Sequence, residues 1–345
     1  MSNIRVIIVD DSALIRGMFE EILNGDPDIE VVAVAEDPYD AREKIKEHNP
    51  DVITLDIEMP KMDGLTFLDK IMSLRPMPVV MVSSLTQKGA EATFKALEMG
   101  AVDYVPKTGS QSFDIDNLRD ELIEKVKAAA KAKVKYSKEA GEEKTEKVKP
   151  VKVAGVKTDK LVAIGSSTGG VEALGQIIPY LPEKSPPIVI TQHMPEKFTE
   201  TFAQRLDRNS TVTVTEAKDK EEIKPGHVYI APGGFHLEVV NNAGKYRCSL
   251  NSGEKVSGHK PSVDVLFSSV AKAAGDKAIG VMLTGMGKDG SIGMVEMKKA
   301  GSYNIGQDEN SCVVYGMPKA AFLAGAVDEQ VSLKNMAKEI LKACN

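Results

Sequence analysis

Three hydroxyl residues stand in a row between an apolar run and two glycines in the segment IGSSTGG, residues 164–170. Residues 165–169 satisfy the pattern G-x-S-x-G, in which a sharp turn between a strand and a helix exposes a nucleophilic serine. Ser167 stands at the centre of this pattern and is therefore the candidate nucleophile. The nucleotide-binding fingerprints fail, because Ser167 stands where G-x-G-x-x-G needs glycine and Val171 stands where the P-loop needs lysine. By itself the pattern also fits a plain helix-capping turn.

A nucleophilic serine needs a base, and the base needs an acid that orients it. The apolar run PPIVITQ is followed by His193, and the run AIGVMLT leads into GMGKDG, which contains Asp289. We expect both residues at the same sheet edge as Ser167, because the carboxyl ends of parallel strands meet there. Asp289 could equally cap the helix that follows it. The remaining histidines are interpreted as surface or packing residues: His48, His227, His236 and His259.

A second set of polar residues follows apolar runs in the first third of the chain. Asp10 and Asp11 end the first run and Asp56 ends the third, while Ser83 and Lys107 end the fourth and fifth. Converging carboxylates repel each other unless a cation joins them, and Mg²⁺ prefers oxygen ligands. A carboxylate beside Mg²⁺, with a lysine and a hydroxyl nearby, can attack a phosphoryl donor. Each acid taken singly fits a helix cap or a turn, but the set on successive strand ends favours a metal site.

The first 107 residues alternate short β-branched runs with amphipathic stretches. The runs are RVIIVDD, EVVAVAED, DVITLDIEMP, PVVMVSSL and AVDYVPK. Ser12 can cap a helix that ends near Gly25. The apolar residues that share one face of this helix are Ile15, Met18, Phe19 and Ile22. This alternation predicts a (βα)5 unit with a doubly wound parallel sheet.

The composition changes between residues 126 and 156, where Lys and Glu dominate and few residues could anchor a core. We interpret this segment as a charged linker with a helical first part; the alternative is a solvated helix inside one larger domain. A second α/β series follows through KLVAIG, PPIVITQH and AIGVMLTG, with a hairpin pattern in HLEVV-NNAG-KYRCSL. The sequence therefore predicts an α/β protein with two doubly wound parallel-sheet domains, residues 1–125 and 157–345. The second domain is expected to be Rossmann-like with a β-hairpin.

Composition limits the class of protein. The chain has 345 residues, of which 42% are apolar, enough for two or three globular domains. No apolar run approaches the roughly 18 residues of a membrane span, and the N-terminus lacks a signal-peptide layout, so we expect a cytoplasmic protein without membrane insertion. A net charge of −6 gives no general attraction to nucleic acid, and none is expected as a partner. The cysteines are too few and too far apart for a disulfide framework or a zinc site: Cys248, Cys312 and Cys344.

Residues 1 to about 122 resemble the receiver domain of two-component response regulators. The resemblance rests on the spacing of the acidic pair, the third aspartate, the hydroxyl and the lysine named above. It implies that Asp56 accepts a phosphoryl group and that Asp10, Asp11 and Asp56 hold Mg²⁺. The switch residues that it implies are Ser83, Tyr104 and Lys107.

STGG, TQHMP and LTGMGKDG together resemble the catalytic domain of the CheB methylesterase family, which joins a receiver to this domain in the same order. The resemblance implies that Ser167 is the nucleophile, His193 the general base and Asp289 its orienter. It also implies a backbone donor to the oxyanion at Met286. The family usually has alanine where this chain has Ser166, but the G-x-S-x-G register and the following Thr-Gly-Gly select the next serine. The order Ser, His, Asp also differs from that of α/β-hydrolases, so a different fold is expected.

The resemblance implies a phosphorylation-activated serine hydrolase that demethylates glutamyl methyl esters on methyl-accepting chemotaxis receptors, releases methanol and deamidates glutamines. One triad can serve both reactions, because both pass through a tetrahedral intermediate. The implied phosphoryl donor is a chemotaxis histidine kinase, with Mg²⁺ for phosphorylation and no cofactor for hydrolysis. Two alternatives stay open. One is a response regulator whose second half only binds a partner, and the other is a serine hydrolase that acts on a small ester.

Overall fold

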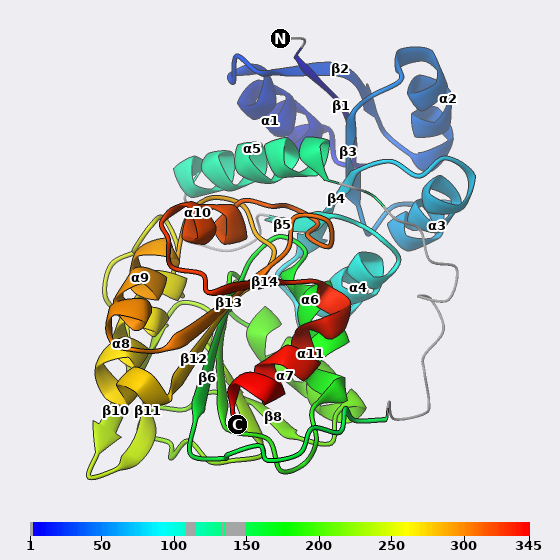
Figure 1. Ribbon diagram of the computed structural model, residues 1–345. Helices are drawn as coiled ribbons and strands as arrows, with labels where there is room; N and C mark the ends of the chain where they lie inside the picture. The colour runs from blue at the N-terminus through cyan, green and yellow to red at the C-terminus, as the bar shows by residue number, and fades with distance from the viewer. Residues whose placement is uncertain (1–2, 108–114, 133, 135–148) are drawn as a thin grey trace. The chain divides into compact units, whose positions relative to one another are not determined.

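The computed structural model describes residues 3–107, 115–132, 134 and 149–345 (Figure 1). The chain divides into two compact units, Met1–Glu143 and Lys144–Asn345. Each unit contains its own parallel sheet with helices on both faces. The predicted α/β architecture with two doubly wound sheets is therefore confirmed.

The sheet of the first unit consists of β1 (Ile4–Val9), β2 (Ile29–Ala35), β3 (Val52–Asp56), β4 (Val79–Ser84) and β5 (Asp103–Lys107). The strands pair in parallel in the order β2-β1-β3-β4-β5. Each strand coincides with one of the β-branched runs, because a strand covered on both faces is apolar along its whole length. The strand order reverses between β1 and β3, and ligands of such sheets bind beyond the carboxyl ends near the reversal.

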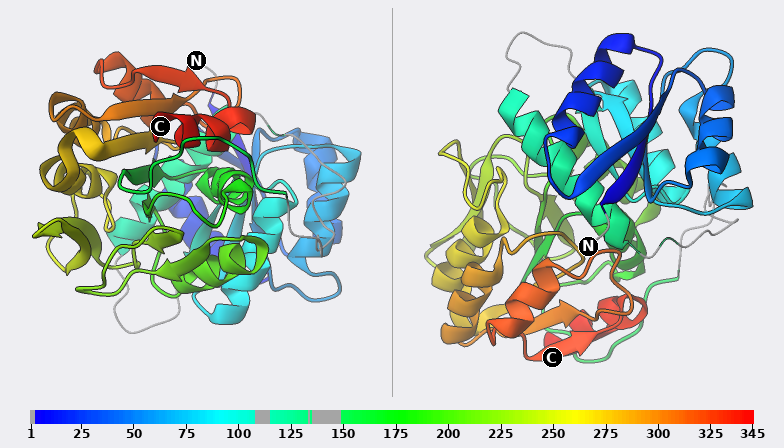
Figure 2. Two further views of the ribbon diagram at one scale, coloured as in Figure 1. Left: turned by 60° about the horizontal axis from the view of Figure 1, so that its bottom comes forward. Right: turned by 90° about the horizontal axis from the view of Figure 1, so that it is seen from above.

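The helices of the first unit are α1 (Ala13–Asn24), α2 (Pro38–His48), α3 (Gly64–Leu74), α4 (Gln87–Glu98) and α5 (Ile115–Lys131). Helices α1 and α5 pack together on one face of the sheet, and α2, α3 and α4 cover the other (Figure 2). Helix α1 has the expected caps, Ser12 at its start and Gly25 at its end, and it buries Ile15, Phe19 and Ile22.

Helix α5 continues past residue 125, where the linker was expected to begin. Val126, Ala128 and Ala129 are completely buried, and Lys127 forms an ion pair of 2.7 Å with Asp26. This Ala- and Lys-rich segment is therefore a packed helix and not an exposed linker. Ala128 and Ala129 face the core, and Lys127 pairs with an aspartate. Residues 133 and 135–148 of the expected linker lie outside the described residues, and the domain boundaries there remain predictions.

The sheet of the second unit consists of β6 (Leu161–Ser166), β7 (Ile188–Gln192), β8 (Thr213–Glu216), β9 (His227–Ile230), β12 (Ala278–Met282), β13 (Tyr303–Gln307) and β14 (Glu329–Val331). The strands pair in parallel in the order β14-β13-β12-β6-β7-β9-β8. The order runs in opposite directions on either side of the β6/β12 pair, which is the reversal point of this sheet.

The helices of the second unit are α6 (Gly170–Ile177), α7 (Phe198–Asn209), α8 (Val263–Ala274), α9 (Ser291–Lys299), α10 (Met317–Leu323) and α11 (Leu333–Ala343), with the short 3₁₀ turns η2 (Ile178–Tyr180) and η3 (Gly275–Lys277). Helices α8, α9 and α10 cover one face and α6, α7 and α11 the other (Figure 1). In the core on the first of these faces, Phe267 and Val270 of α8 pack with Leu161 of β6.

The predicted hairpin is present as β10 (His236–Asn242) and β11 (Lys245–Asn251), which pair in antiparallel. Its turn has two residues, Ala243 and Gly244, because Asn242 pairs with Lys245. Both turn residues adopt positive φ, as a type I′ turn requires. The three cysteines are buried and free. Among the described helices, none has the length and apolar character that crossing a membrane needs.

Candidate active site

Three loops meet at the carboxyl edge of the second sheet. Ser167 directly follows β6, His193 directly follows β7, and the loop after β12 contains Asp289. Strands β6 and β12 form the reversal point, where the connecting chains leave in opposite directions and open a crevice for side chains. The three residues predicted from distant sequence segments therefore come together at one place.

Ser167, His193 and Asp289 form an unbroken line of hydrogen bonds. Nδ1 of His193 lies 3.2 Å from Oγ of Ser167, and Nε2 of His193 lies 2.8 Å from Oδ2 of Asp289. Because a carboxylate only accepts hydrogen bonds, Nε2 carries the proton and Nδ1 is the acceptor for the Ser167 hydroxyl. The ring thus faces the opposite way from the serine-protease template, in which Nε2 faces the serine.

Asp289 is buried, with 2% of its surface exposed, and its carboxylate has four donors. Besides His193, these are the Ser262 hydroxyl at 2.8 Å and the backbone N–H groups of Val263 at 2.7 Å and Asp264 at 3.0 Å. The two N–H groups belong to the first turn of α8, where unpaired donors and the helix dipole favour an anion. Burial by itself would raise the pKa of Asp289, but the hydrogen bond and charge of His193 and the backbone donors outweigh burial and lower that pKa.

The expected alternative role of Asp289 as a cap of the next helix is not what the structure shows. Helix α9 has Gly290 at its cap position and no side-chain cap. Asp289 instead satisfies the start of α8, which precedes it in the chain. The Asp289 carboxylate has enough lone pairs to accept from both the start of α8 and His193.

The two adjacent serines occupy different environments. Ser166 is completely buried and its hydroxyl donates to Oε1 of Gln192 at 2.6 Å, whereas Ser167 is half-buried. Nε2 of Gln192 donates in turn to the backbone oxygens of Ser167 at 3.0 Å and His193 at 3.1 Å. Gln192 therefore ties the serine loop to the histidine loop. The sequence analysis missed it, although a polar residue that ends a buried strand was an available signal.

The loop after β12 runs directly against Ser167. The backbone N–H of Ser167 donates to the Thr284 oxygen at 3.0 Å. A Cβ added to Gly285 would lie 2.8 Å from Cβ of Ser167, so only glycine fits there without a shift. Met286 follows immediately, and its backbone N–H makes no hydrogen bond within the described part of the chain. This N–H stays a candidate donor to an oxyanion.

His259 was interpreted as a surface or packing residue, and the structure shows what it packs against. Its ring stacks on that of His193 with 3.7 Å between ring centroids and 17° between planes. No motif links these two residues, because the contact joins loops that are 66 positions apart. His227 lies at the start of β9 and is bonded to the Pro225 oxygen. His236 is buried at the start of β10, where it accepts from the backbone N–H of Ser262 at 3.1 Å.

In the first unit, the three predicted carboxylates also come together. Ligand oxygens of Asp10, Asp11 and Asp56 all lie within 4.8 Å of one another. Nζ of Lys107 contacts Asp56 at 2.5 Å and Asp10 at 3.0 Å. Lys107 contacts two of the three carboxylates, so the all-oxygen cluster keeps a net negative charge, which fits Mg²⁺.

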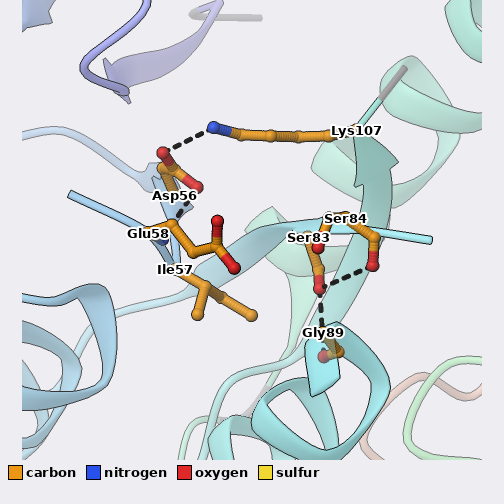
Figure 3. A pocket seen from close by; sticks show the side chains of 7 residues that line it. All are labelled: Asp56, Ile57, Glu58, Ser83, Ser84, Gly89 and Lys107. Carbon is orange, nitrogen blue, oxygen red and sulfur yellow. Dashed lines mark hydrogen bonds and ion pairs between the residues drawn. The ribbon is translucent and has the colours of Figure 1, made fainter. Parts of the chain in front are cut away.

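Asp56 lies in a pocket at the carboxyl edge of the first sheet, with Lys107 reaching over it and Ser83 across from it (Figure 3). Burial raises the pKa of Asp56 to about 6; Lys107 opposes this shift and the carboxylate of Asp10 adds to it. The Ser83 hydroxyl donates to the Gly89 oxygen at 3.1 Å. Tyr104 does not line this pocket: its ring is buried, with Nζ of Lys125 4.7 Å from the ring centroid.

Crowding at Gly285 yields a first prediction. Gly285→Ala should force the loop away from Ser167 and slow its covalent labelling by a serine-directed fluorophosphonate by about tenfold or more, since displacements near 1 Å cost about that much or more. The matched control is Gly175→Ala in α6, where a Cβ would meet nothing within 4 Å. Gel-based labelling rates measure both variants. Equal rates for Gly285→Ala and Gly175→Ala would show that the loop is not held against the serine.

Comparisons with known proteins agree on one family. The family model described as CheB methylesterase matches residues 162–340, and the response regulator receiver domain model matches residues 6–122. The chain is 58% identical over 342 residues to protein-glutamate methylesterase/protein-glutamine glutaminase 1 of Caulobacter vibrioides, covering 99% of this chain and 98% of that protein. It is 52% identical to the protein-glutamate methylesterase/protein-glutamine glutaminase of Thiobacillus denitrificans, covering 99% and 96%.

A solved structure agrees as well. The catalytic domain of the Thermotoga maritima CheB methylesterase is 44% identical, covers 53% of this chain and 97% of that one, and superposes with a TM-score of 0.52. The chain therefore belongs to the CheB methylesterase family and carries a receiver domain ahead of the methylesterase domain.

Proposed function

We propose that this protein hydrolyses glutamyl methyl esters on methyl-accepting chemotaxis receptors, with Ser167 as nucleophile, His193 as general base and Asp289 as the residue that orients the base. By its family it is a protein-glutamate methylesterase and protein-glutamine glutaminase under the control of a receiver domain. The observation that supports the residue assignment is the line of hydrogen bonds from the Ser167 hydroxyl through His193 to Asp289.

In the proposed mechanism Oγ of Ser167 attacks the ester carbonyl while Nδ1 of His193 takes its proton. The tetrahedral intermediate collapses when Nδ1 returns this proton to the leaving oxygen, which releases methanol and leaves a glutamyl ester on Ser167. A water molecule then attacks this ester with Nδ1 as its base, and the products are free glutamate and the serine. With a glutamine side chain, ammonia leaves in place of methanol.

The Asp289 carboxylate stabilises the imidazolium that forms on His193 in each of these steps. The hydrogen bond and charge of His193 and the backbone donors of Val263 and Asp264 outweigh burial, so the pKa of Asp289 lies below the usual range of aspartate and the group stays ionised. The charge on the intermediate's oxygen needs donors aimed at the carbonyl, and we assign the backbone N–H of Met286 as one of them. Gly285 allows this part of the loop to approach Ser167.

In the receiver, we propose that Asp56 accepts a phosphoryl group from a chemotaxis histidine kinase. Asp10, Asp11 and Asp56 would hold Mg²⁺, which supplies positive charge to the phosphoryl oxygens. Lys107 already contacts Asp56 and can follow a phosphoryl oxygen there. The Ser83 hydroxyl can exchange the Gly89 oxygen for the phosphoryl group, and the nearby Tyr104 then repacks. Expectations about nucleic acid, membrane insertion and a cytoplasmic location stay predictions.

Two alternatives make different predictions. A domain that only binds a partner has no need of the hydrogen-bonded line at the sheet edge, and a hydrolase for a small ester would not depend on the receptor. Methanol release from methylated receptor, tested in competition with a small ester, separates all three.

The second prediction distinguishes the two serines. Ser167→Ala should lower kcat for methanol release by several orders of magnitude, about as loss of a triad member does elsewhere. Ser166→Ala should keep most of the activity, because it removes only one hydrogen bond to Gln192. Methanol release by the two full-length variants gives the answer. Near-normal turnover by Ser167→Ala would contradict the assignment of Ser167 as the nucleophile.

The third prediction concerns activation. A small phosphodonor with Mg²⁺ should raise methanol release by wild type about tenfold, which needs only about 1.4 kcal/mol of differential stabilisation. Asp56→Asn should show neither this rise nor a hydroxylamine-labile phosphoryl label, and chelation of Mg²⁺ should abolish both in wild type. Persistent labelling of Asp56→Asn would place the phosphoryl group elsewhere.

A further inference from the structure

The ring stack between His259 and His193 covers a face of the candidate base. The 3.7 Å separation of the ring centroids and the 17° angle between the planes describe a close parallel stack. The two ring nitrogens of His193 already face Ser167 and Asp289. These two hydrogen bonds still allow the plane of the His193 ring to tilt. The stack with His259 restrains this tilt.

His259 is held by a tight turn. Ser257 and Gly258, the central residues of the turn, have φ values of +54° and +84°, and Val256 and His259 exchange backbone hydrogen bonds of 3.1 and 3.0 Å. This is the pattern of a type I′ turn. A serine at positive φ is strained, and it persists only where the surrounding structure holds it. The Ser257 hydroxyl is held by Oδ2 of Asp264 at 3.1 Å.

Asp264 connects this turn to the catalytic acid. Its backbone N–H donates to Oδ1 of Asp289 at 3.0 Å, and its carboxylate also accepts from the Gly293 N–H at 2.8 Å. His236 provides a second connection between the start of α8 and the segment before the turn. It accepts from the Ser262 N–H at 3.1 Å and donates to the Glu254 oxygen at 2.8 Å. The start of α8 thus fixes both the acid at the edge of His193 and the ring on its face.

The reaction itself explains why such a restraint is useful. The hydrogen bond from Ser167 to His193 is lost once Ser167 gives its proton to Nδ1 and bonds to the carbonyl carbon. Nδ1 must then deliver that proton to the leaving oxygen and, after methanol has left, accept another proton from water. Through these steps the bond to Asp289 stays, but a single bond lets the ring pivot. Misplacement by about 1 Å can cost about 100-fold in rate. A flat ring against the face of His193 limits that pivot.

We propose that His259 is a positioning residue that holds the plane of the general base by aromatic stacking. The inference rests on the proposed roles of Ser167, His193 and Asp289. It requires a flat aromatic ring at position 259 and does not require the nitrogens of that ring.

The test compares flat and non-flat side chains in the full-length protein, activated by a phosphodonor and Mg²⁺. His259→Phe should keep kcat for methanol release within about threefold, whereas His259→Leu and His259→Met should lower kcat by about tenfold or more with little change in KM. The matched control is His227→Leu, which removes a histidine that stacks on Tyr229 outside the site, with 6.1 Å between ring centroids. This control should behave like wild type.

A second readout does not depend on the receptor. Labelling of Ser167 by a fluorophosphonate requires activation by His193, so the Leu and Met variants should label about tenfold more slowly or worse, and the Phe variant should label like wild type. If wild type labels but releases no methanol, the proposed substrate is wrong while the labelling series still decides the role of His259.

Three results would overturn the inference. Full activity of folded Leu or Met variants would show that the stack is dispensable. Failure of the Phe variant alongside Leu would show that the nitrogens of His259 matter instead. A higher KM with unchanged kcat would make His259 a substrate contact. Thermal melting of each variant confirms that a loss of rate is not a loss of fold.

Discussion

The catalytic edge of the second unit depends on one buried carboxylate, that of Asp289. A buried charge is costly unless donors surround it, and here four hydrogen bonds do so. Each bond also fixes something else. The bonds from Val263 and Asp264 fix the start of α8. The bond from His193 selects the tautomer in which Nδ1 faces Ser167. The side chain of Asp264 also accepts from Ser257, in the turn that contains His259. The ionised carboxylate of Asp289, stabilised by the N-terminus of α8, therefore positions the site.

The two units place carboxylates at equivalent edges of similar sheets but shift their pKa values in opposite directions. Asp56 is buried beside the like charge of Asp10 with one lysine to offset both, and its pKa rises to about 6. Asp289 is buried as well, but several donors point at it, and its pKa falls. The two environments fit the roles proposed for these residues, because a phosphoryl acceptor must react and change state, whereas an orienting acid must stay ionised while the histidine beside it gains and loses a proton.

The positions of Ser167, His193 and Asp289 could be predicted because each follows a buried parallel strand, and strand ends share an edge. Two of their partners, Gln192 and His259, were not predicted. Gln192 looked like the end of a strand, and His259 lies in a loop whose neighbours are set only by tertiary packing. The direction in which the His193 ring faces depends on the start of α8, which no local pattern links to Asp289.

Helix α5 shows a different limit of sequence reasoning. Its second half is rich in lysine and alanine, a composition typical of an exposed linker helix. Only the folded chain shows that Val126, Ala128 and Ala129 meet a core. A buried helix face of large apolar residues can be predicted from the sequence, whereas a buried face built mainly from small residues such as alanine cannot be distinguished from an exposed one.

The most direct test of the central claim is the kcat of Asp289→Asn in the full-length, activated protein. Asparagine keeps the size, and its oxygen can still accept from Ser262 and Asp264, but the amide nitrogen that replaces Oδ2 cannot accept from the Val263 N–H. We therefore expect a modest fall in melting temperature with the fold retained. The asparagine amide can donate to Nε2 of His193, which would place the proton on Nδ1, where it faces Ser167. Asp328→Asn is the control, because Asp328 also pairs with a backbone N–H, that of Asn304 at 2.8 Å, and with Lys298 at 3.0 Å. We predict that kcat falls about 10⁴-fold in Asp289→Asn, as in a serine protease with the same change, and that it is unchanged in the control. A folded Asp289→Asn variant that keeps kcat within about tenfold of wild type would contradict the account.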